Sequence, residues 1–361
     1  MLLAVYRYHQ NVFNGLNGMV ITKGFRKIRS TMTTLLTSVV TRKIITPLPI
    51  FITDRCNSRC QICSIWKKKS IDMDVEIIKE ILNDKVITKF SSFIIAGGEP
   101  LLHPRFDDVM QLLQGRNYLF LSNGLMVRKL IEAVRKYNIR NLGLSLDGTP
   151  ETYKRVRGVD GFSKNEEVVK ELKNDNINIY VNFVINPWNS REDLKYVINF
   201  CKKYGVHLFV GYYQNLPYFE TTEPSGHLYD VGNLLVNPPL SEPRHPYFSL
   251  YHQWVVGNLR IPCFGVFLRP SIRTNGDVDL CEGRESTLGN LYEKSLGEIW
   301  TSKRTRYLQM QSFSCNCCWG DDQRTRDAST ASVLRSLFPP VLLNLILGKY
   351  DWEKVPSVWQ W

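Results

Sequence analysis

Residues 48–215 alternate six short β-rich segments with five longer segments of helical periodicity. Strands joined by helical crossovers lie parallel in one sheet, with the helices on its outer face. The sequence therefore predicts an α/β fold, a partial (β/α)6 barrel, with its sites at the carboxyl ends of the strands. The β-rich segments are residues 49–54, 90–98, 118–124, 139–148, 177–186 and 206–213, and the helical ones are residues 72–83, 105–114, 126–137, 163–174 and 190–204.

Three cysteines, Cys56, Cys60 and Cys63, follow the first predicted strand within eight residues. Cysteine thiolates hold iron–sulfur clusters, and a cubane normally takes four of them. No further cysteine occurs before Cys201, so three ligands would leave one iron open, as a catalytic metal centre requires. Zinc is the competing interpretation of the triplet on its own.

The motif "GGEP", Gly97–Pro100, ends the second predicted strand. Together with Cys56-x3-Cys60-x2-Cys63 at the end of the first strand, it resembles the radical S-adenosylmethionine (SAM) enzymes. In that family the open iron of a [4Fe–4S] cluster is chelated by the amino and carboxylate groups of SAM. The reduced cluster cleaves SAM to a 5′-deoxyadenosyl radical, which abstracts a hydrogen from the substrate. The resemblance implies that Gly97, Gly98, Glu99 and Pro100 bind the cofactor's methionine amine, with glycines allowing a close backbone approach.

The resemblance extends to polar residues at the next strand ends. Asn123, Ser145 and Asp147 stand where the family often places contacts to the ribose and carboxylate of SAM. Arg157, in "YKRVRG", resembles an arginine that pairs with the cofactor carboxylate, a bidentate task that suits a guanidinium. The alternative for each residue is a strand-end cap or a surface ion pair.

A second cysteine set occupies residues 263–318. Cys263 and Cys281 flank a predicted hairpin around "TNGD", and "CNCC" follows with Cys315, Cys317 and Cys318. This order resembles the SPASM/twitch extension of radical SAM enzymes, which carries auxiliary clusters. It implies one auxiliary [4Fe–4S] cluster on Cys263, Cys281, Cys315 and Cys318, with Cys317 as a spare or substitute ligand. Structural zinc is the alternative, and Cys201 is expected to be a buried apolar residue.

The N-terminal arm is basic and amphipathic. Residues 1–53 carry seven of the 46 Lys and Arg residues and no acid, in a chain of 361 residues with a formal charge of +12. A helix over residues 19–41 would gather Ile21, Phe25, Ile28, Met32, Leu35 and Val39 in one stripe, widened by Leu36 and Val40. The apolar tail, residues 333–361, is broken at Pro339-Pro340 and contains three tryptophans. Each end could lie on an anionic membrane surface, or could pack on the barrel.

These features define five predicted regions: an arm (1–47), a radical SAM barrel (48–215), a bridge (216–258), an auxiliary-cluster domain (259–322) and a tail (323–361). No segment is apolar for the roughly 20 residues that a transmembrane helix needs. Clustered cysteines fit the reducing cytoplasm. A cytoplasmic protein is therefore expected, and it would be peripheral to the membrane if the two apolar ends bind lipid.

The resemblance implies a low-potential electron donor such as ferredoxin or flavodoxin. The preferred substrate is a lipid, a lipid-linked compound or a glycan, because the arm is too short for a leader-binding domain. The product would arise by oxidation, epimerisation or C–C bond formation. A ribosomal-peptide maturase and a non-enzymatic metal scaffold are the alternatives. A nucleotide-modifying enzyme is a further alternative, although that group of the family lacks this auxiliary cysteine set. Nucleic acid is not expected as a partner.

Overall fold

The computed structural model describes residues 19–213, 250–251, 253–254, 257–282, 286–315 and 322–358, without the side chains of residues 19–24 and 322–326. The described strands form one sheet in the order β6-β5-β4-β3-β2-β1-β7-β8-β9. All neighbours from β1 to β6 are parallel, which confirms the predicted barrel strands and their order. These strands are β1 (Leu48–Phe51), β2 (Ser92–Ala96), β3 (Asn117–Ser122), β4 (Asn141–Ser145), β5 (Asn178–Ile185) and β6 (His207–Tyr212).

The two faces of the barrel sheet differ: one packs against helices, and the other lines a cavity. Side chains alternate across a strand, and on β5 Ile179, Val181, Phe183 and Ile185 are buried in the core. The residues between them, among them Tyr180 and Asn182, line a cavity inside the barrel. Valine and isoleucine on the packed face suit a sheet covered by helices.

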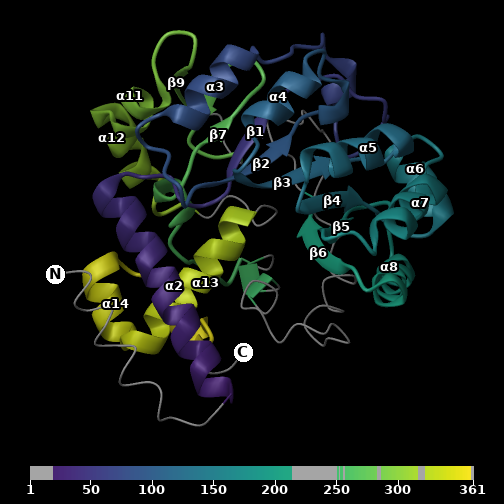
Figure 1. Ribbon diagram of the computed structural model, residues 1–361. Helices are drawn as coiled ribbons and strands as arrows, with labels where there is room; N and C mark the ends of the chain where they lie inside the picture. The colour runs from purple at the N-terminus through teal and green to yellow at the C-terminus, as the bar shows by residue number, and fades with distance from the viewer. Residues whose placement is uncertain are drawn as a thin grey trace.

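Helices cover the outer face of this sheet (Figure 1). The crossover helices are α3 (Val75–Asn83), α4 (Phe106–Leu112), α5 (Val127–Tyr137), α6 (Pro150–Arg157), α7 (Phe162–Leu172) and α8 (Arg191–Tyr204), with short 3-10 turns η1 (Ile65–Lys67) and η2 (Pro100–Leu102). The sequence analysis missed α6. Its start carries a readable signal, because the Thr149 hydroxyl accepts from the Thr152 amide and Pro150 occupies the first turn.

The predicted hairpin around "TNGD" is confirmed as β7 (Ser271–Ile272) and β8 (Asp277–Asp279), which pair antiparallel. The hairpin continues the barrel sheet, because Ile272 of β7 pairs in parallel with Ile50 of β1, and both residues are fully buried. Pairing covers an edge of β1 that would otherwise expose its backbone groups. The elements around it are η4 (Gly265–Phe267), β9 (Thr287–Asn290), α11 (Leu296–Thr301) and α12 (Lys303–Ser312). Most of the expected bridge, residues 216–258, lies outside the described residues.

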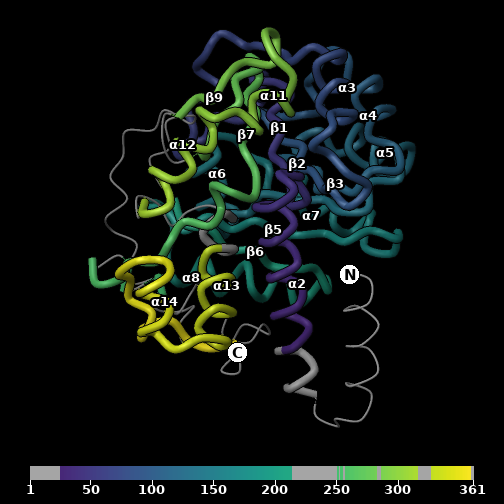
Figure 2. Tube along the Cα trace, turned by 90° about the vertical axis from the view of Figure 1, so that its left-hand side faces the viewer, coloured from purple at the N-terminus to yellow at the C-terminus, as the bar shows by residue number. Residues whose placement is uncertain are grey.

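Two helices from the N-terminal and C-terminal regions of the chain lie side by side. Helix α2 (Met19–Thr41) lies beside α13 (Asp322–Leu337) in both ribbon views, and α14 (Pro340–Leu347) and η5 (Trp352–Lys354) follow (Figures 1 and 2). The predicted arm helix and the helix break at Pro339-Pro340 are thus confirmed. Of the expected apolar stripe, Met32, Leu35 and Val39 pack against the core.

Two expectations about the ends need correction. Phe25, Leu36 and Val40 do not join the packed stripe but are 38%, 55% and 74% exposed. Trp352 is fully buried in the core, so this tryptophan stabilises the fold and is not available to a membrane interface. Trp359 and Trp361 lie outside the described residues. Within the described ranges, no helix combines the length and the apolarity needed to cross a bilayer.

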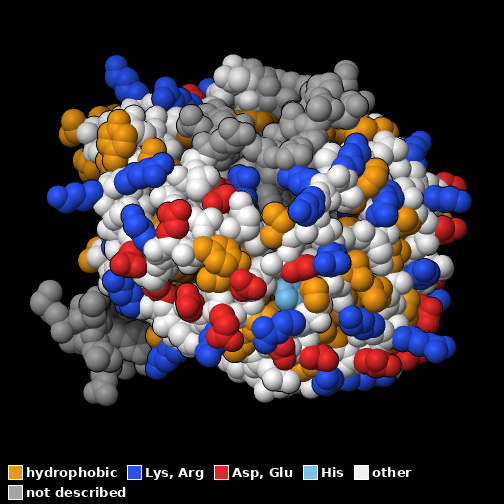
Figure 3. Space-filling view, turned by 90° about the horizontal axis from the view of Figure 1, so that it is seen from above, with side chains coloured by type: hydrophobic (Ala, Val, Ile, Leu, Met, Phe, Trp, Pro, Cys, Tyr) orange, Lys and Arg blue, Asp and Glu red, His pale blue; other side chains and the backbone are white. Residues whose placement is uncertain are grey.

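The surface charge is mixed on the side where Figure 1 places α3 and α4. Lysine and arginine side chains alternate there with aspartate and glutamate (Figure 3). A nucleic-acid interface needs a contiguous basic face, and the visible part of this side does not present one.

Candidate functional site

The cysteine loop, residues 56–63, follows β1 and is bound by the end of α6. The amides of Arg59 and Gln61 donate to the carbonyls of Arg157 and Val156, each at 2.9 Å. Gly158, with φ +66°, ends α6, and a Cβ there would lie 2.4 Å from the Arg59 carbonyl oxygen. Only glycine permits this left-handed conformation and this approach together. Helix α6 therefore fixes the loop that carries the three cysteines.

The three thiols differ in how far solvent reaches them. Cys60 is 8% exposed, and Cys56 and Cys63 are half-buried. Burial raises the pKa of Cys56 to about 11 and that of Cys63 to about 12. The raised pKa values of Cys56 and Cys63 favour their protonated thiols at neutral pH, so these two groups must release protons when they bind a metal centre.

The donor set fits an iron–sulfur cluster better than a single ion. Among the described residues, no three Cys, His, Asp or Glu side chains converge on one point. A mononuclear zinc site needs such convergence, whereas a cubane offers a separate iron to each thiolate. Three spaced thiolates in one half-buried loop match the second arrangement.

The GGEP motif lies against the segment that leads into the cysteine loop. The amides of Gly98 and Glu99 donate to the carbonyls of Thr53 and Arg55, both at 2.7 Å. A Cβ on Gly97 or Gly98 would come within 2.4 Å of these same carbonyl oxygens. The glycines therefore allow two strand ends to pair closely, a structural reason that the sequence analysis did not foresee.

Glu99 points into the protein. It is fully buried and accepts hydrogen bonds from the Ser122 hydroxyl at 3.0 Å, the Asn123 amide at 2.8 Å and the Leu101 amide at 3.4 Å. Burial raises its pKa to about 7, although these donors favour the carboxylate. Glu99 thus ties the GGEP turn to the end of β3 and positions Asn123.

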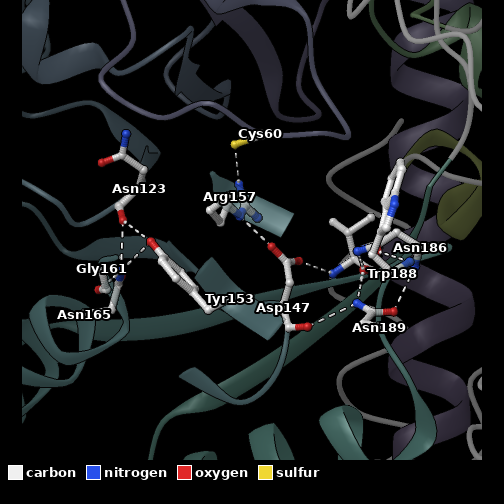
Figure 4. A network of polar contacts seen from close by, with 11 residues as sticks. Cys60, Asn123, Asp147, Tyr153, Arg157, Gly161, Asn165, Asn186, Trp188 and Asn189 are labelled. Carbon is white, nitrogen blue, oxygen red and sulfur yellow. Dashed lines mark hydrogen bonds and ion pairs between the residues drawn. The ribbon is translucent and has the colours of Figure 1, made fainter. Parts of the chain in front are cut away.

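Arg157 connects the cysteine loop to the end of β4. Its Nε donates to Asp147 Oδ2 at 2.5 Å, and its Nη1 lies 3.8 Å from Cys60 Sγ (Figure 4). Asp147 is fully buried and also accepts from the Val184 amide at 3.1 Å. Burial by itself lowers the pKa of Arg157, but the charges of Asp147 and Cys60 outweigh it, so the pKa lies above its ordinary value.

Asn123 sits beside the first cysteine. Its side-chain amide donates to Asn57 Oδ1 at 2.7 Å and lies 4.0 Å from Cys56 Sγ. Its backbone oxygen accepts from the Asn165 side chain at 2.9 Å, and Tyr153 joins the same network (Figure 4). This network fixes the end of β3 next to the cysteine loop.

One cavity of about 910 Å³ collects most of the expected first site. Nine of the eleven residues line it: Cys56, Cys60, Cys63, Gly97, Gly98, Pro100, Asn123, Ser145 and Arg157. Glu99 and Asp147 are not part of its wall, and they act on it through Asn123 and Arg157. Tyr212 and Tyr213 also line the cavity. His207 stacks on Tyr180 and does not line the cavity.

The sequence analysis missed the contribution of the chain ends to this cavity. Helix α2 contributes Lys27, Ser30, Thr31 and Thr34 to its wall, and α13 contributes Ser329 and Thr330. The hydroxyl residues of α2 recur at helical spacing, which was the available signal. It was interpreted only as the polar side of an amphipathic helix.

The second cysteine set is partly described. Cys263 and Cys281 are buried and Cys315 is half-buried, while Cys317 and Cys318 lie outside the described residues. The Cys263 amide donates to the Phe313 carbonyl at 2.8 Å, which brings Cys263 close to the segment that carries Cys315. Cys281 lies two residues after the end of β8. The described thiols therefore come from the three segments that the auxiliary cluster was predicted to use.

Comparisons with known proteins agree with this arrangement. Residues 50–201 match the radical SAM superfamily, and residues 263–319 match an iron–sulfur cluster-binding domain, SPASM. A tungsten-containing aldehyde ferredoxin oxidoreductase cofactor-modifying protein from Pyrococcus furiosus is 25% identical, over 76% of this chain and 92% of its own. The sporulation killing factor maturation protein SkfB from Bacillus subtilis is also 25% identical, over 74% of this chain and 67% of its own.

The fold has solved relatives. The crystal structure of Streptococcus suis SuiB bound to precursor peptide SuiA superposes with a TM-score of 0.58 at 16% identity, covering 86% of this chain and 77% of SuiB. The predicted fold class is thereby confirmed. The expected SAM, its [4Fe–4S] cluster and an auxiliary cluster are also confirmed as the cofactors that the two matched domains imply. The chain belongs to the radical SAM superfamily and carries a SPASM iron–sulfur cluster-binding domain.

Proposed function

We propose that the protein removes a hydrogen atom from an unactivated C–H bond of a lipid, lipid-linked or glycan substrate held at a membrane surface. The observation that carries this proposal is the position of α2. One face of this helix lines the cavity that contains Cys56, Cys60 and Cys63, and another face is apolar and exposed. A helix placed in this way joins the reactive cavity to the outer surface.

The three faces of α2 follow from its 3.6-residue repeat. Lys27, Thr31 and Thr34 point into the cavity, and the packed stripe lies about a quarter turn away. Leu36 and Val40 emerge on the side opposite the cavity, where Phe25 is 38% exposed and Arg26 and Arg29 are exposed as well. Apolar and basic side chains on one exposed face favour an anionic lipid surface.

Helix α14 and the turn before it carry further exposed apolar side chains. Val341, Leu345 and Ile346 are 80%, 82% and 64% exposed, and Leu337 and Phe338 at the preceding turn are 43% and 39% exposed. Exposed apolar side chains gathered in this way are a feature of interaction sites. In both ribbon views α14 and the first half of α2 lie at the same end of the molecule (Figures 1 and 2).

Within the cavity, the chain's own residues would bind and orient the cofactor. Cys56, Cys60 and Cys63 would hold the first cluster, and Asn123, Ser145 and Arg157 face the space beside them. When bound, the cluster and SAM supply one electron and a 5′-deoxyadenosyl radical, which becomes 5′-deoxyadenosine on taking the substrate hydrogen. A ferredoxin or flavodoxin would deliver the electron.

The fate of the substrate depends on the second cysteine set. Cys263, Cys281, Cys315 and Cys318, with Cys317 as a substitute, would hold an auxiliary cluster able to accept the electron left on the substrate. We therefore favour net oxidation over epimerisation or C–C bond formation. The five regions expected from the sequence remain the proposed division of the chain.

A peptide maturase is the second candidate. It is favoured by SkfB, named as a maturation protein, and by SuiB, whose structure holds a precursor peptide. The cavity of about 910 Å³ would also admit a peptide side chain.

One experiment separates the two candidates. The protein is reconstituted anaerobically, and release of 5′-deoxyadenosine is measured with extracted membrane lipids and with a library of precursor peptides. Lipid-stimulated release supports the proposed function, and stimulation by peptides alone assigns the maturase role. The Cys60→Ala variant is the control, because it should release none with either substrate.

A further inference from the structure

The outer side of the cysteine loop is basic. Residues 55–71, which contain this loop and the turn after it, carry five Lys or Arg residues and no Asp or Glu. Three of the five are exposed and form no ion pair within the described part of the chain. We call these three residues the basic rim: Arg59, Lys67 and Lys69.

Trp66 holds two cations of the rim in place. Arg59 Cζ and Lys67 Nζ each lie 5.2 Å from the centre of its indole ring, a distance at which a cation is attracted to an aromatic face. Arg59 Nη1 also donates to the carbonyls of Cys56 and Ser58, at 3.1 and 2.8 Å. These contacts fix where the two charges stand, which a run of unattached surface lysines would not do.

The same tryptophan connects the rim to a predicted cluster ligand. Its indole N–H donates to the Cys60 carbonyl at 3.2 Å, and Trp66 lines the cavity that contains the three thiols. In the sequence, Arg59 directly precedes Cys60, and Lys67 follows Cys63 by four residues. The basic rim thus lies on the loop that would hold the first cluster, one aromatic side chain away from a ligand.

The two sides of the cysteine loop face different surroundings. The inner side faces the cavity, which Gly97, Asn123 and Arg157 also line and where SAM would bind. The rim residues are not part of the cavity wall, and they are exposed to solvent. A protein that delivers an electron must come close to the cluster without entering the space of SAM and the substrate. The outer side of the loop offers that approach.

We propose that the basic rim docks an acidic ferredoxin or flavodoxin beside the first cluster. In this step the reduced carrier loses one electron, the cluster gains it, and no covalent bond forms or breaks. Positive charge on the rim complements an acidic carrier, so it steers the encounter and orients the two proteins. The inference rests on the proposed function only in that cleavage of SAM needs a reduced cluster.

The test measures the rate of electron transfer into the anaerobically reconstituted protein. A reduced ferredoxin and a reduced flavodoxin, each with an acidic surface, are mixed with it by stopped flow at low and at high salt. We expect the second-order rate constant of the wild type to fall at least about tenfold at high salt with one or both carriers. The reason is that charge steering raises association rates by roughly 10–10³ and is screened by salt.

Variants assign this rate to the rim. Lys67→Glu with Lys69→Glu reverses two of its charges and leaves Arg59 with its loop contacts. At low salt this variant should accept electrons at least about tenfold more slowly, with a weaker salt dependence. Lys173→Glu with Lys202→Glu is the matched control, because it changes the net charge equally at two exposed positions, at the end of α7 and on α8. This control should accept electrons as fast as the wild type.

A small reductant checks that the variants keep their cluster. Excess dithionite needs no docking site, so the rim variant and the wild type should give electron paramagnetic resonance signals of equal size after reduction. A slower reaction with the carriers then reports the encounter and not a damaged loop.

The inference would be overturned if neither carrier reduced the wild type, or if its rate did not depend on salt with either carrier. An unchanged rate in the rim variant, or an equal loss in the control, has the same consequence. Release of 5′-deoxyadenosine with dithionite as the reductant separates this failure from that of the proposed function. A protein that releases it without any dependence on the rim loses only the docking site. A protein that the carriers reduce through the rim but that releases none loses only the radical chemistry.

Discussion

Arg157 Nη1 lies 3.8 Å from Cys60 Sγ, and Asp147 holds the same guanidinium through Nε at 2.5 Å. The pair is buried, with the Asp147 side chain fully covered and that of Arg157 11% exposed. A cation is therefore fixed beside one cluster ligand before any cofactor binds. We therefore predict that Arg157 acts on the first cluster, in addition to the contact with the SAM carboxylate that the family resemblance implies.

Replacing Arg157 should change the reduction potential of the first cluster. Reduction adds negative charge, and nearby charges and hydrogen bonds to sulfur tune cluster potentials. Arg157→Gln, made together with Asp147→Asn to avoid an unpaired buried acid, should shift the midpoint potential to more negative values. The measurement is a redox titration followed by electron paramagnetic resonance, without SAM.

The matched control for Arg157 is Arg155→Gln. Arg155 lies on the same helix but bonds the Trp188 carbonyl, away from the cysteines. The midpoint potential of the first cluster in the Arg155→Gln variant should equal that in the wild type. An unchanged potential in the Arg157 double variant would show that the cation does not act on the cluster.

Gly158→Ala should loosen the cysteine loop. A left-handed conformation costs a non-glycine residue roughly 1–2 kcal/mol, and the new Cβ would also lie 2.4 Å from the Arg59 carbonyl oxygen. We expect lower thermal stability and reduced iron content of the first cluster.

Gly205→Ala is the control for this substitution. Gly205 also ends a helix with φ +66°, but a Cβ there meets nothing within 4 Å. It should show the conformational cost alone and keep a full first cluster. Equal iron loss in both variants would mean that the contact with Arg59 does not matter.

Stability should depend on pH through Glu99. Its folded pKa is about 7, against an ordinary value of 4.5. Between these values the folded protein keeps a proton that the unfolded chain has lost, so stability falls as pH rises from about 4.5 to 7 and levels off above. The total effect is at most roughly 3 kcal/mol.

Glu99→Gln should remove this dependence. The variant loses part of the hydrogen bonding with Ser122 and Asn123, so it is less stable near pH 5, yet the gap to the wild type should narrow toward pH 7. Thermal midpoints of both proteins at pH 5, 6, 7 and 8 provide the comparison. A constant gap over this range would show that Glu99 keeps an ordinary pKa.

The sequence predicted the barrel well because its signal is local. Alternating patterns placed β1 to β6 within a few residues, and the cysteine spacing with GGEP indicated the family that the comparisons then showed. Helix α6 was missed because its eight residues are mostly polar, with Tyr153 and Val156 as its buried apolar positions, although Thr149 and Pro150 marked its start. The pairing of β7 with β1 was not predictable, because it joins segments about 220 residues apart and only tertiary packing brings Ile50 to Ile272.

The roles of Glu99, Asp147 and α2 were hidden for a similar reason. A motif gives the residue type at a strand end but not the direction of its side chain. Glu99 and Asp147 turn into the protein, where backbone amides and Arg157 bind them. Periodicity showed that α2 is amphipathic, but it could not reveal that its polar face closes a cavity.

Iron counting should separate the two proposed clusters. The wild type should hold about eight irons per chain, as two cubanes require. Cys60→Ala and Cys281→Ala should each lose about half, but only Cys60→Ala should abolish cofactor cleavage in the absence of substrate. Cys201→Ala is the control, because Cys201 packs in the core at 6% exposure and should not affect iron content. If the wild type instead contains about four irons and one zinc ion per chain, the second cysteine set binds zinc and not an auxiliary cluster.

Membrane binding should depend on α14. Leu345 and Ile346 are 82% and 64% exposed, and burying two such side chains in lipid contributes roughly 1.5–3 kcal/mol each. Leu345→Glu with Ile346→Glu should therefore weaken sedimentation with phosphatidylglycerol vesicles by at least about tenfold. Phe90→Glu alters a residue that is 73% exposed in the turn before β2 and should bind as the wild type does. If added salt and the α14 variant both leave sedimentation unchanged, the exposed apolar surface serves a different partner, and the lipid substrate loses its main support.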